Sequence, residues 1–154
     1  KSVFAPVKGE VIPLDQVDDQ AFASGVMGKG MAIIPTEGKV CSPCDGVVSA
    51  IFPTGHAVGV TSNDGVEVLI HIGMDTVKLE GKYFTAHVQD GSEVKEGDKV
   101  TRGQILVEFD MDAVQKAGYS LVTPVIITNT NQFADIVTSA SGTVDVADEL
   151  LVVM

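Results

Sequence analysis

The chain reads HAVGVT at residues 56–61, SNDG at 62–65 and VEVLIHI at 66–72. Two β-branched runs that flank a turn-forming tetrapeptide predict a β-hairpin. Because side chains alternate between the two faces of a strand, every second residue of the later run shares one face. That face is entirely apolar and consists of Val66, Val68, Ile70 and Ile72. We expect it to lie against the core, with Ala57 and Gly59 opposite.

The hairpin also predicts that two histidines lie close together on its other face. If residues 62–65 all form the loop, His56 lies directly opposite His71, with Cβ atoms roughly 4.5–5.5 Å apart. If Asp64-Gly65 makes a two-residue turn, the register slides by two and the histidines become diagonal neighbours, about 7–8 Å apart. A three-residue loop would instead place them on opposite faces. The other side chains expected on the histidine face are Val58, Leu69 and Glu67.

The composition indicates a single globular domain that spans residues 1–154. Hydrophobic residues make up 45% of the chain, which is typical of a folded protein with a sizeable core. The chain has no apolar run near the roughly 20 residues of a membrane span, and its first residues lack the apolar segment of a signal peptide. We therefore expect a cytoplasmic protein that does not insert into a membrane, and we expect it to be a monomer.

The formal net charge of −11 argues against nucleic-acid binding, because phosphates are bound mainly by Lys and Arg side chains. An acidic surface is suited to a basic protein partner, which it attracts by electrostatic steering. Solubility alone would also account for this charge. The charge therefore excludes one class of partner without identifying another.

The rest of the chain reads as short strands separated by tight turns. Glycines precede β-branched residues in a similar pattern three times, at Gly9, Gly46 and Gly142. A second series alternates glycine and apolar residues at every third position: Gly91, Val94, Gly97, Val100, Gly103 and Leu106. Such spacing predicts successive tight turns that lead into short strands. The expected fold class is all-β, an antiparallel β-sandwich or flattened barrel.

Two segments are expected to contain helical turns. Residues 110–118 begin with an Asp and end with a Gly, which are typical of the N-cap and C′ positions of a helix. Residues 18–28 form a mixed loop that has room for one helical turn. The apolar residues of this loop suit either the core or an adaptable surface patch.

The two cysteines of the chain lie in the motif Cys41-Ser42-Pro43-Cys44. Such a motif occurs in redox-active pairs and as half of a zinc site. No second pair of ligands stands at zinc-finger spacing, and no redox-type helix follows the motif. Because strand-like residues flank it, we interpret it as a turn between strands with two structural thiols in a reducing compartment.

Phosphoryl transfer is the first chemistry that the histidine pair predicts. A neutral imidazole is a good nucleophile near pH 7, and its phosphoramidate is suited to onward transfer. One histidine would attack while the other donates a hydrogen bond to the phosphoryl oxygens. The hydroxyl of Thr54 could fix the tautomer of His56. No cofactor, nucleotide or metal is needed when the donor is itself a phosphohistidine, and the chain has no P-loop motif.

A metal site is the alternative. His56, His71 and Asp75 provide three ligands, enough for a zinc-dependent hydrolase with an open coordination position. Zinc peptidases on glycine-rich β folds usually add a His-x-His pair, which this chain lacks, so this interpretation is the weaker one. A biotinyl- or lipoyl-type carrier is set aside because neither Met-Lys-Met nor Asp-Lys-Ala occurs in the chain.

Two longer segments resemble a known family. LIHIGMDTVKLEG at 69–81 resembles the signature of the glucose-type IIA component (IIA-glucose family) of the bacterial phosphoenolpyruvate-dependent sugar phosphotransferase system. IFPTGHA at 51–57 resembles the upstream histidine segment of that family. The resemblance extends over nearly the whole chain, including residues 28–33, 42–46 and 123–125. It implies an antiparallel β-sandwich and a single IIA phosphocarrier domain.

The resemblance also implies a phosphotransferase component of sugar transport. His71 would be the nucleophile, phosphorylated on Nε2 by the phosphohistidine of the histidine phosphocarrier protein. It would pass the phosphoryl group to a cysteine of the IIB domain of a sugar permease. His56 matches the supporting histidine of the family, and Thr54 matches its hydroxyl partner.

The resemblance further implies a partner-binding surface around the histidines. Asp19 and Asp75 match acidic positions that would face an arginine of the carrier. The apolar ring that docks partners would consist of Phe22, Val26, Met27, Val40, Phe52, Leu69 and Val77. Leu69 stands where a Phe is common, and Gly55 stands where a larger residue is often found. His87 matches no functional position, and we expect it at the surface.

Overall fold

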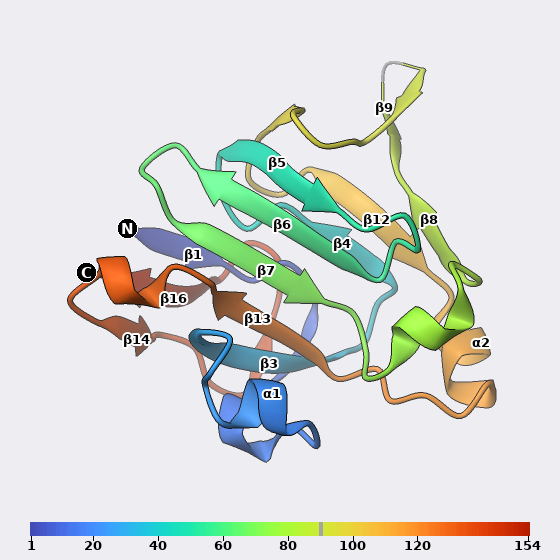
Figure 1. The fold of residues 1–154 in the computed structure, drawn as a ribbon, viewed down its shortest axis with the longest axis horizontal. Helices are drawn as coiled ribbons and strands as arrows, with labels where there is room; N and C mark the ends of the chain where they lie inside the picture. The colour runs from blue at the N-terminus through green and yellow to red at the C-terminus, as the bar shows by residue number, and fades with distance from the viewer. Residues whose placement is uncertain (90) are drawn as a thin grey trace.

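The computed structural model describes residues 1–89 and 91–154 and is built mainly from antiparallel sheets (Figure 1). An eight-stranded sheet runs in the order β11 (Lys99–Val100), β5 (Gly46–Ile51), β6 (Ala57–Ser62), β7 (Glu67–His71), β13 (Thr123–Ile127), β3 (Lys29–Pro35), β2 (Gly9–Pro13) and β15 (Thr143–Val144). Its order begins at β11 and ends at β15, so it does not close into a barrel.

Three smaller sheets complete the architecture. One contains β1 (Ser2–Phe4), β16 (Glu149–Val153) and β14 (Ile136–Thr138). Another contains β4 (Lys39–Cys41), β12 (Ile105–Phe109) and β8 (Phe84–Ala86), and the smallest pairs β10 (Ser92–Glu93) with β9 (Val88–Gln89). All strand pairs within the described residues are antiparallel. The predicted all-β antiparallel fold is confirmed.

The main core joins the inner face of the large sheet to the smaller sheets. Val66, Val68, Ile70 and Ile72 are all buried in it, as the apolar face of the second run predicted. Leu106 and Val107 of β12 and Leu150 and Leu151 of β16 belong to the same cluster. Burial of such side chains is the main favourable term in folding.

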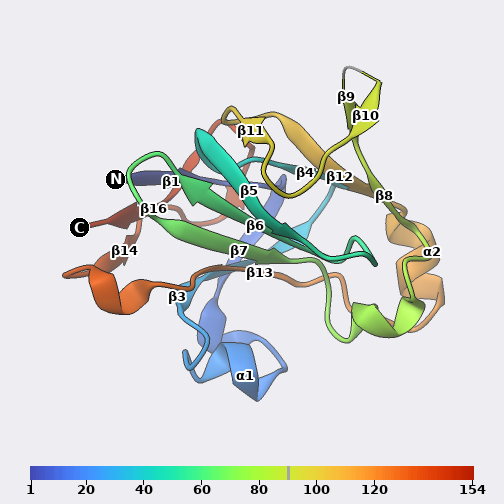
Figure 2. The same cartoon turned by 45° about the horizontal axis from the view of Figure 1, so that its top comes forward.

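Two short helices cover part of the outer face of the large sheet. The 3-10 helix η1 (Leu14–Gln16) and α1 (Gln20–Ala23) lie below β3 and β13 in both views (Figures 1 and 2). Phe22 of α1 packs with Ala32 of β3 and Ile126 of β13 in a second apolar cluster. Leu69 is partly buried against the same cluster. This cover therefore lies on the face of the sheet that carries the side chain of Leu69.

The hairpin register differs from both predicted registers. Ala57 pairs with His71 and Thr61 pairs with Glu67, so three residues form the loop between Ser62 and Val66. The Val66 carbonyl accepts a hydrogen bond from the Ser62 N–H, at 2.8 Å, and the Ser62 hydroxyl accepts one from the Val66 N–H, at 2.9 Å. The Ser62 side chain thus stabilises a three-residue loop, which the positions of Asp64 and Gly65 alone did not predict.

This register also corrects the predicted faces of β6. Val58 lies opposite Ile70 and is fully buried in the main core, whereas it was expected on the histidine face. Ala57 and Gly59 lie opposite His71 and Leu69, so they share the histidine face instead of the core face. The error has one cause, because a shift of one residue exchanges the two faces of a strand.

Both predicted helical segments are confirmed. α1 has Asp19 as its N-cap, whose carboxylate accepts a hydrogen bond from the Ala21 N–H at 2.9 Å. α2 (Met111–Lys116) begins after Asp110, whose carboxylate accepts from the Ala113 N–H at 3.1 Å. Two further 3-10 helices are η2 (Thr76–Leu79) and η3 (Thr130–Gln132). No helix in the described part of the chain is long and apolar enough to span a membrane.

The predicted turn at the cysteines and the predicted series of short strands are also confirmed. Cys41 ends β4, β5 begins at Gly46, and both cysteines are buried free thiols. Burial raises the pKa of Cys44 to about 12, which leaves its thiol unreactive at neutral pH. The apolar members of the glycine series, Val94, Val100 and Leu106, are buried.

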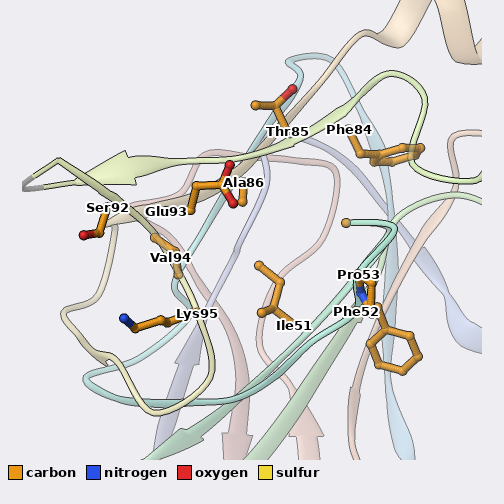
Figure 3. A pocket seen from close by; sticks show the side chains of 11 residues that line it. Ile51, Phe52, Pro53, Phe84, Thr85, Ala86, Ser92, Glu93, Val94 and Lys95 are labelled. Atoms are coloured by element: carbon orange, nitrogen blue, oxygen red, sulfur yellow. The ribbon is translucent and has the colours of Figure 1, made fainter.

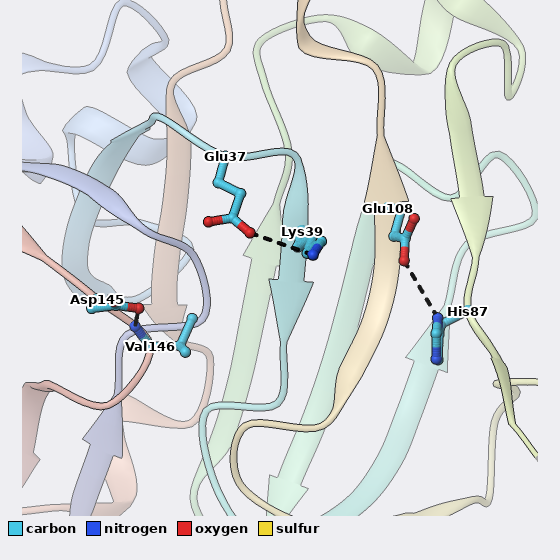
Figure 4. A network of polar contacts seen from close by, with 6 residues as sticks. All are labelled: Glu37, Lys39, His87, Glu108, Asp145 and Val146. Carbon is cyan, nitrogen blue, oxygen red and sulfur yellow. Dashed lines mark hydrogen bonds and ion pairs between the residues drawn. The ribbon is translucent and has the colours of Figure 1, made fainter.

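The sheet of β4, β12 and β8 carries two ion pairs on its exposed side (Figure 4). Lys39 Nζ lies 3.5 Å from Glu37 Oε1, and His87 Nδ1 lies 3.6 Å from Glu108 Oε1. All four side chains are partly exposed, so each pair contributes little to stability. His87 therefore lies at the surface, as predicted from the sequence.

Candidate functional site

His71 is the last residue of β7, and a backbone carbonyl holds its ring. Its Nδ1 lies 2.8 Å from the carbonyl oxygen of Gly73. A carbonyl oxygen can only accept a hydrogen bond, so in the neutral ring Nδ1 carries the proton and donates it. The lone pair of the neutral imidazole is then on Nε2. This nitrogen is the one available to attack an electrophile.

Gly73 can hold this position only because it has no side chain. Its φ is 75°, in the left-handed region, where a non-glycine residue is strained. A Cβ at this position would lie 2.6 Å from the carbonyl oxygen of Ser120. Gly73 lies within the segment that resembles the family signature, but the sequence pattern predicted no role for it. A glycine two residues after a strand-terminal histidine was the available signal.

His56 reaches His71 from a loop and not from the strand. β6 begins at Ala57, and Gly55 takes a φ of 73°, so the chain turns immediately before His56. The His56 carbonyl accepts a hydrogen bond from the Ile72 N–H at 2.7 Å. The two imidazole centroids lie 5.1 Å apart, with ring planes at 79°. The predicted proximity of the histidines is confirmed, although the register that predicted it is wrong.

Thr54 contacts the ring of His56, as the sequence predicted. Its Oγ1 lies 2.5 Å from Nδ1 of His56. A hydroxyl can donate as well as accept, so this contact permits either tautomer. When the hydroxyl donates to Nδ1, the proton of the neutral ring is on Nε2 and can be donated to a third group.

Both imidazoles are predominantly neutral near pH 7. Burial, and to a smaller extent repulsion from His71, lowers the pKa of His56 to about 4. Burial also lowers the pKa of His71, whereas the Gly73 carbonyl and the carboxylates of Asp19 and Asp75 partly raise it. A neutral imidazole is the nucleophilic form. The site therefore holds its histidines in the form that can react.

Two phenylalanine rings flank the histidine pair. The Phe22 ring lies 5.1 Å from His71, and the Phe52 ring lies 5.3 Å from His56 in an edge-on arrangement. Phe22 is only 4% exposed, so it packs against the His71 ring as a buried residue and does not belong to an exposed docking surface. Phe52 is 44% exposed and lies at the surface. The expectation of surface docking is thus corrected for Phe22.

The other expected partner-binding residues divide by exposure. Val26, Met27, Val77 and Asp75 are exposed, and Asp19 and Leu69 are half-buried. Val40 is fully buried: it lies in β4, which pairs with β12, and its side chain belongs to the main core. A side chain without exposed surface cannot dock a partner, so the expectation for Val40 is wrong.

A cavity of about 640 Å³ adjoins the site at Phe52 (Figure 3). Ile51, Phe52 and Pro53 line one side, and the segment Phe84–Ala86 lines another. The lining is completed by Gly55 and by Ser92, Glu93, Val94 and Lys95. Phe52 lines this cavity and its ring also contacts that of His56.

The alternative metal site is not supported by the positions of its three residues. Within residues 1–89 and 91–154, no group of three or more His, Cys, Asp or Glu side chains could hold a metal ion. His56, His71 and Asp75 therefore do not form the set of zinc ligands that the alternative required.

The chain is similar to known proteins in both sequence and fold. A family model described as phosphoenolpyruvate-dependent sugar phosphotransferase system, EIIA 1, matches residues 1–133. Among solved structures, the chain is similar to glucose permease IIA from Mycoplasma capricolum, with a TM-score of 0.85 and 33% identity. That match covers 98% of this chain and 94% of the other.

Two relatives are larger proteins. The chain is 50% identical over 145 residues to the PTS system beta-glucoside-specific EIIBCA component of Dickeya chrysanthemi, covering 94% of this chain and 22% of that protein. It is 55% identical over 132 residues to the protein of the same name in Bacillus subtilis (strain 168), covering 86% of this chain and 21% of that protein. The chain therefore spans about a fifth of the length of these relatives.

Proposed function

The chain belongs to the EIIA 1 family of the phosphoenolpyruvate-dependent sugar phosphotransferase system, and we propose that it is a phosphohistidine relay domain with His71 as the phosphorylated residue. Residues 1–154 would form one such domain. The observation that carries the proposal is the hydrogen bond from His71 Nδ1 to the Gly73 carbonyl. It leaves the Nε2 lone pair free in a neutral ring, as a nucleophile requires.

In the first step, Nε2 of His71 attacks the phosphorus atom of a phosphohistidine on the histidine phosphocarrier protein. The new N–P bond forms as the N–P bond of the donor breaks, and the donor imidazole leaves with the bonding electron pair. The phosphorylated His71 ring keeps its proton on Nδ1 and becomes cationic. The Gly73 carbonyl stabilises that charge through the hydrogen bond it already accepts.

His56 acts on the charge that develops on the phosphoryl group. With Thr54 donating to its Nδ1, the His56 ring presents Nε2–H as a hydrogen-bond donor. Such a preorganised donor stabilises phosphoryl oxygens in the transition state. The 5.1 Å separation of the rings leaves His56 close enough to serve a group bound to Nε2 of His71. In this scheme His71 attacks the phosphorus atom and His56 stabilises the phosphoryl oxygens.

In the second step, a cysteine thiolate of a IIB domain attacks the phosphorus atom of phospho-His71. The S–P bond forms, the N–P bond breaks, and His71 returns to its neutral Nδ1–H tautomer. Because two relatives are EIIBCA components, the IIB domain is proposed to belong to the same permease system. Those relatives are named beta-glucoside-specific, so β-glucosides are the first sugar class to test.

Partner docking is proposed on the exposed residues around the pair. Val26, Met27, Phe52 and Val77 provide apolar surface, and large exposed apolar side chains are typical of interaction sites. Asp19 and Asp75 would attract the basic side chains of the carrier. The net charge of −11 suits this steering. We propose that the domain meets the carrier in the cytoplasm as a monomer.

The proposal is tested by intact mass after incubation with phosphoenolpyruvate, enzyme I, the carrier and a chelator. We expect a gain of one acid-labile phosphoryl group, which is lost again when a IIB domain with a free cysteine is added. A protein that gains no mass under these conditions would contradict the relay function. The chelator removes any contribution from a bound metal ion.

A further inference from the structure

Thr76 lies directly beneath the turn that carries the functional site. It is the first residue of η2, and its side chain is fully buried. Its hydroxyl donates to the Ile72 carbonyl at 2.5 Å. Its methyl group lies so close to Gly73 that a Cβ there would be 2.6 Å from Thr76 Cγ2. One side chain therefore contacts two of the four residues that precede it.

Ile72 connects the two histidine segments by a backbone hydrogen bond at the end of the β6–β7 pairing. Its N–H donates to the His56 carbonyl at 2.7 Å, and it follows His71 directly in the chain. Because its carbonyl accepts from Thr76, both polar groups of the Ile72 backbone are held. The position of this backbone decides where the chain leaves β7 relative to His56.

The turn after Ile72 contains two residues in the left-handed region of backbone conformation. Gly73 and Asp75 have φ values of 75° and 58°, and a non-glycine residue such as Asp75 is held there at an energetic cost. The Met74 N–H donates to the Ser120 carbonyl at 3.1 Å, which connects the turn to the segment before β13. The buried Thr76 hydroxyl provides a second hydrogen bond to the turn, at the Ile72 carbonyl.

We propose that Thr76 is a positioning residue of the relay: its hydroxyl and methyl group hold the Ile72-Gly73 turn so that the Gly73 carbonyl stays on Nδ1 of His71. Thr76 touches neither the phosphoryl group nor the imidazole in this scheme. It acts through Gly73, by keeping His71 in the tautomer with a free Nε2. The expected effect of Thr76 on phosphoryl transfer rests on the proposed function. Its expected effect on the His71 tautomer rests on the geometry alone.

Thr76→Val tests the role of the hydroxyl, because valine keeps the shape of threonine and removes the donor. Nitrogen-15 NMR of the imidazoles should show His71 as a mixture of tautomers in this variant and as the Nδ1–H form in the wild type. Phosphorylation by the carrier should slow by about tenfold or more, since displaced reacting groups and lost supporting contacts cost this much.

Two further comparisons distinguish a positioning role of Thr76 from a general loss of packing or stability. Ser42→Ala removes another buried hydroxyl, which donates to the Cys44 carbonyl at 2.7 Å in the turn between β4 and β5, and should leave the His71 tautomer and the transfer rate unchanged. If Thr76→Val does not fold, Thr76→Ser and Thr76→Ala decide, because they differ only in the hydroxyl. The serine variant should be faster than the alanine variant and keep more of the Nδ1–H form.

An unchanged His71 tautomer in Thr76→Val, or equal tautomers and rates in the serine and alanine variants, would overturn the proposal. A wild-type protein that is not phosphorylated at all would contradict the relay function instead. In that case the tautomer comparison still decides the role of Thr76, because NMR observes the ring without any phosphoryl donor.

Discussion

The two histidines lie 5.1 Å apart, yet the protein holds them by different means. His71 ends a central strand, and a backbone carbonyl accepts from its Nδ1. His56 lies in the loop before β6, and a threonine hydroxyl contacts its Nδ1. A carbonyl allows one tautomer of a neutral ring, whereas a hydroxyl allows both. This difference supports the proposal that the fixed ring is the nucleophile and the adaptable ring is the stabilising donor.

The largest effect is expected from His71→Gln, which should abolish phosphorylation. Glutamine keeps a polar side chain of similar length but has no nucleophilic nitrogen. Intact mass after incubation with the donor system measures the result. The control is His87→Gln, which replaces a surface histidine of an exposed ion pair and should be phosphorylated normally.

His56→Gln should still accept a phosphoryl group but transfer it slowly. Removing one transition-state donor typically lowers a rate by about 10²–10³-fold. Stopped-flow or quench measurement of transfer to a IIB cysteine checks the expected slowing. The roles of the two rings are reversed if His56→Gln is not phosphorylated while His71→Gln is phosphorylated normally.

Thr54→Val should have a smaller effect, with transfer slowed by about tenfold, because supporting contacts are worth roughly that much. The variant removes the hydroxyl that contacts Nδ1 of His56 and keeps the shape of the side chain. Thr54→Ser retains the hydroxyl and should behave like the wild type. Equal rates in the valine and serine variants would remove Thr54 from the scheme. Nitrogen-15 NMR should show a changed tautomer for His56 only, with His71 unaffected.

The smallest effect is expected from pH. Since the folded pKa of His56 is about 4 and its unfolded value is about 6.5, the unfolded chain binds more protons between these values. The free energy of unfolding should therefore fall as the pH drops from 6.5 toward 4, by about 1 kcal/mol at pH 5 after allowance for solvent screening.

Urea unfolding at pH 7 and pH 5 measures this loss of stability, with His56→Gln as the comparison. The variant should lose less stability than the wild type, because it lacks the titrating ring. The His56 resonances should show no titration between pH 6 and 8. A midpoint near 6.5 would mean that the ring is not desolvated as the structure indicates.

Several features of this protein follow from the sequence by itself. Alternation along residues 66–72 identified the core face of β7, and glycine spacing identified the short strands after residue 91. Asp110 and Gly118 marked the ends of α2 correctly, because caps depend on residues within one turn of the helix. Thr54 and His56 were placed in contact because they are two residues apart. All of these depend on local geometry.

Other features were decided only by the tertiary structure. The hairpin register depended on the Ser62 side chain in a three-residue loop, and His56 reached His71 because the chain turns at Gly55. Val40 was expected on a docking surface but is buried by its pairing with β12. Sequence patterns describe the alternation of side chains within one strand. The direction of a loop and the burial of an edge strand such as β4 depend on segments distant in the sequence. The contact between His71 and Gly73 and the hydrogen bond from Thr76 were therefore seen only in the folded chain.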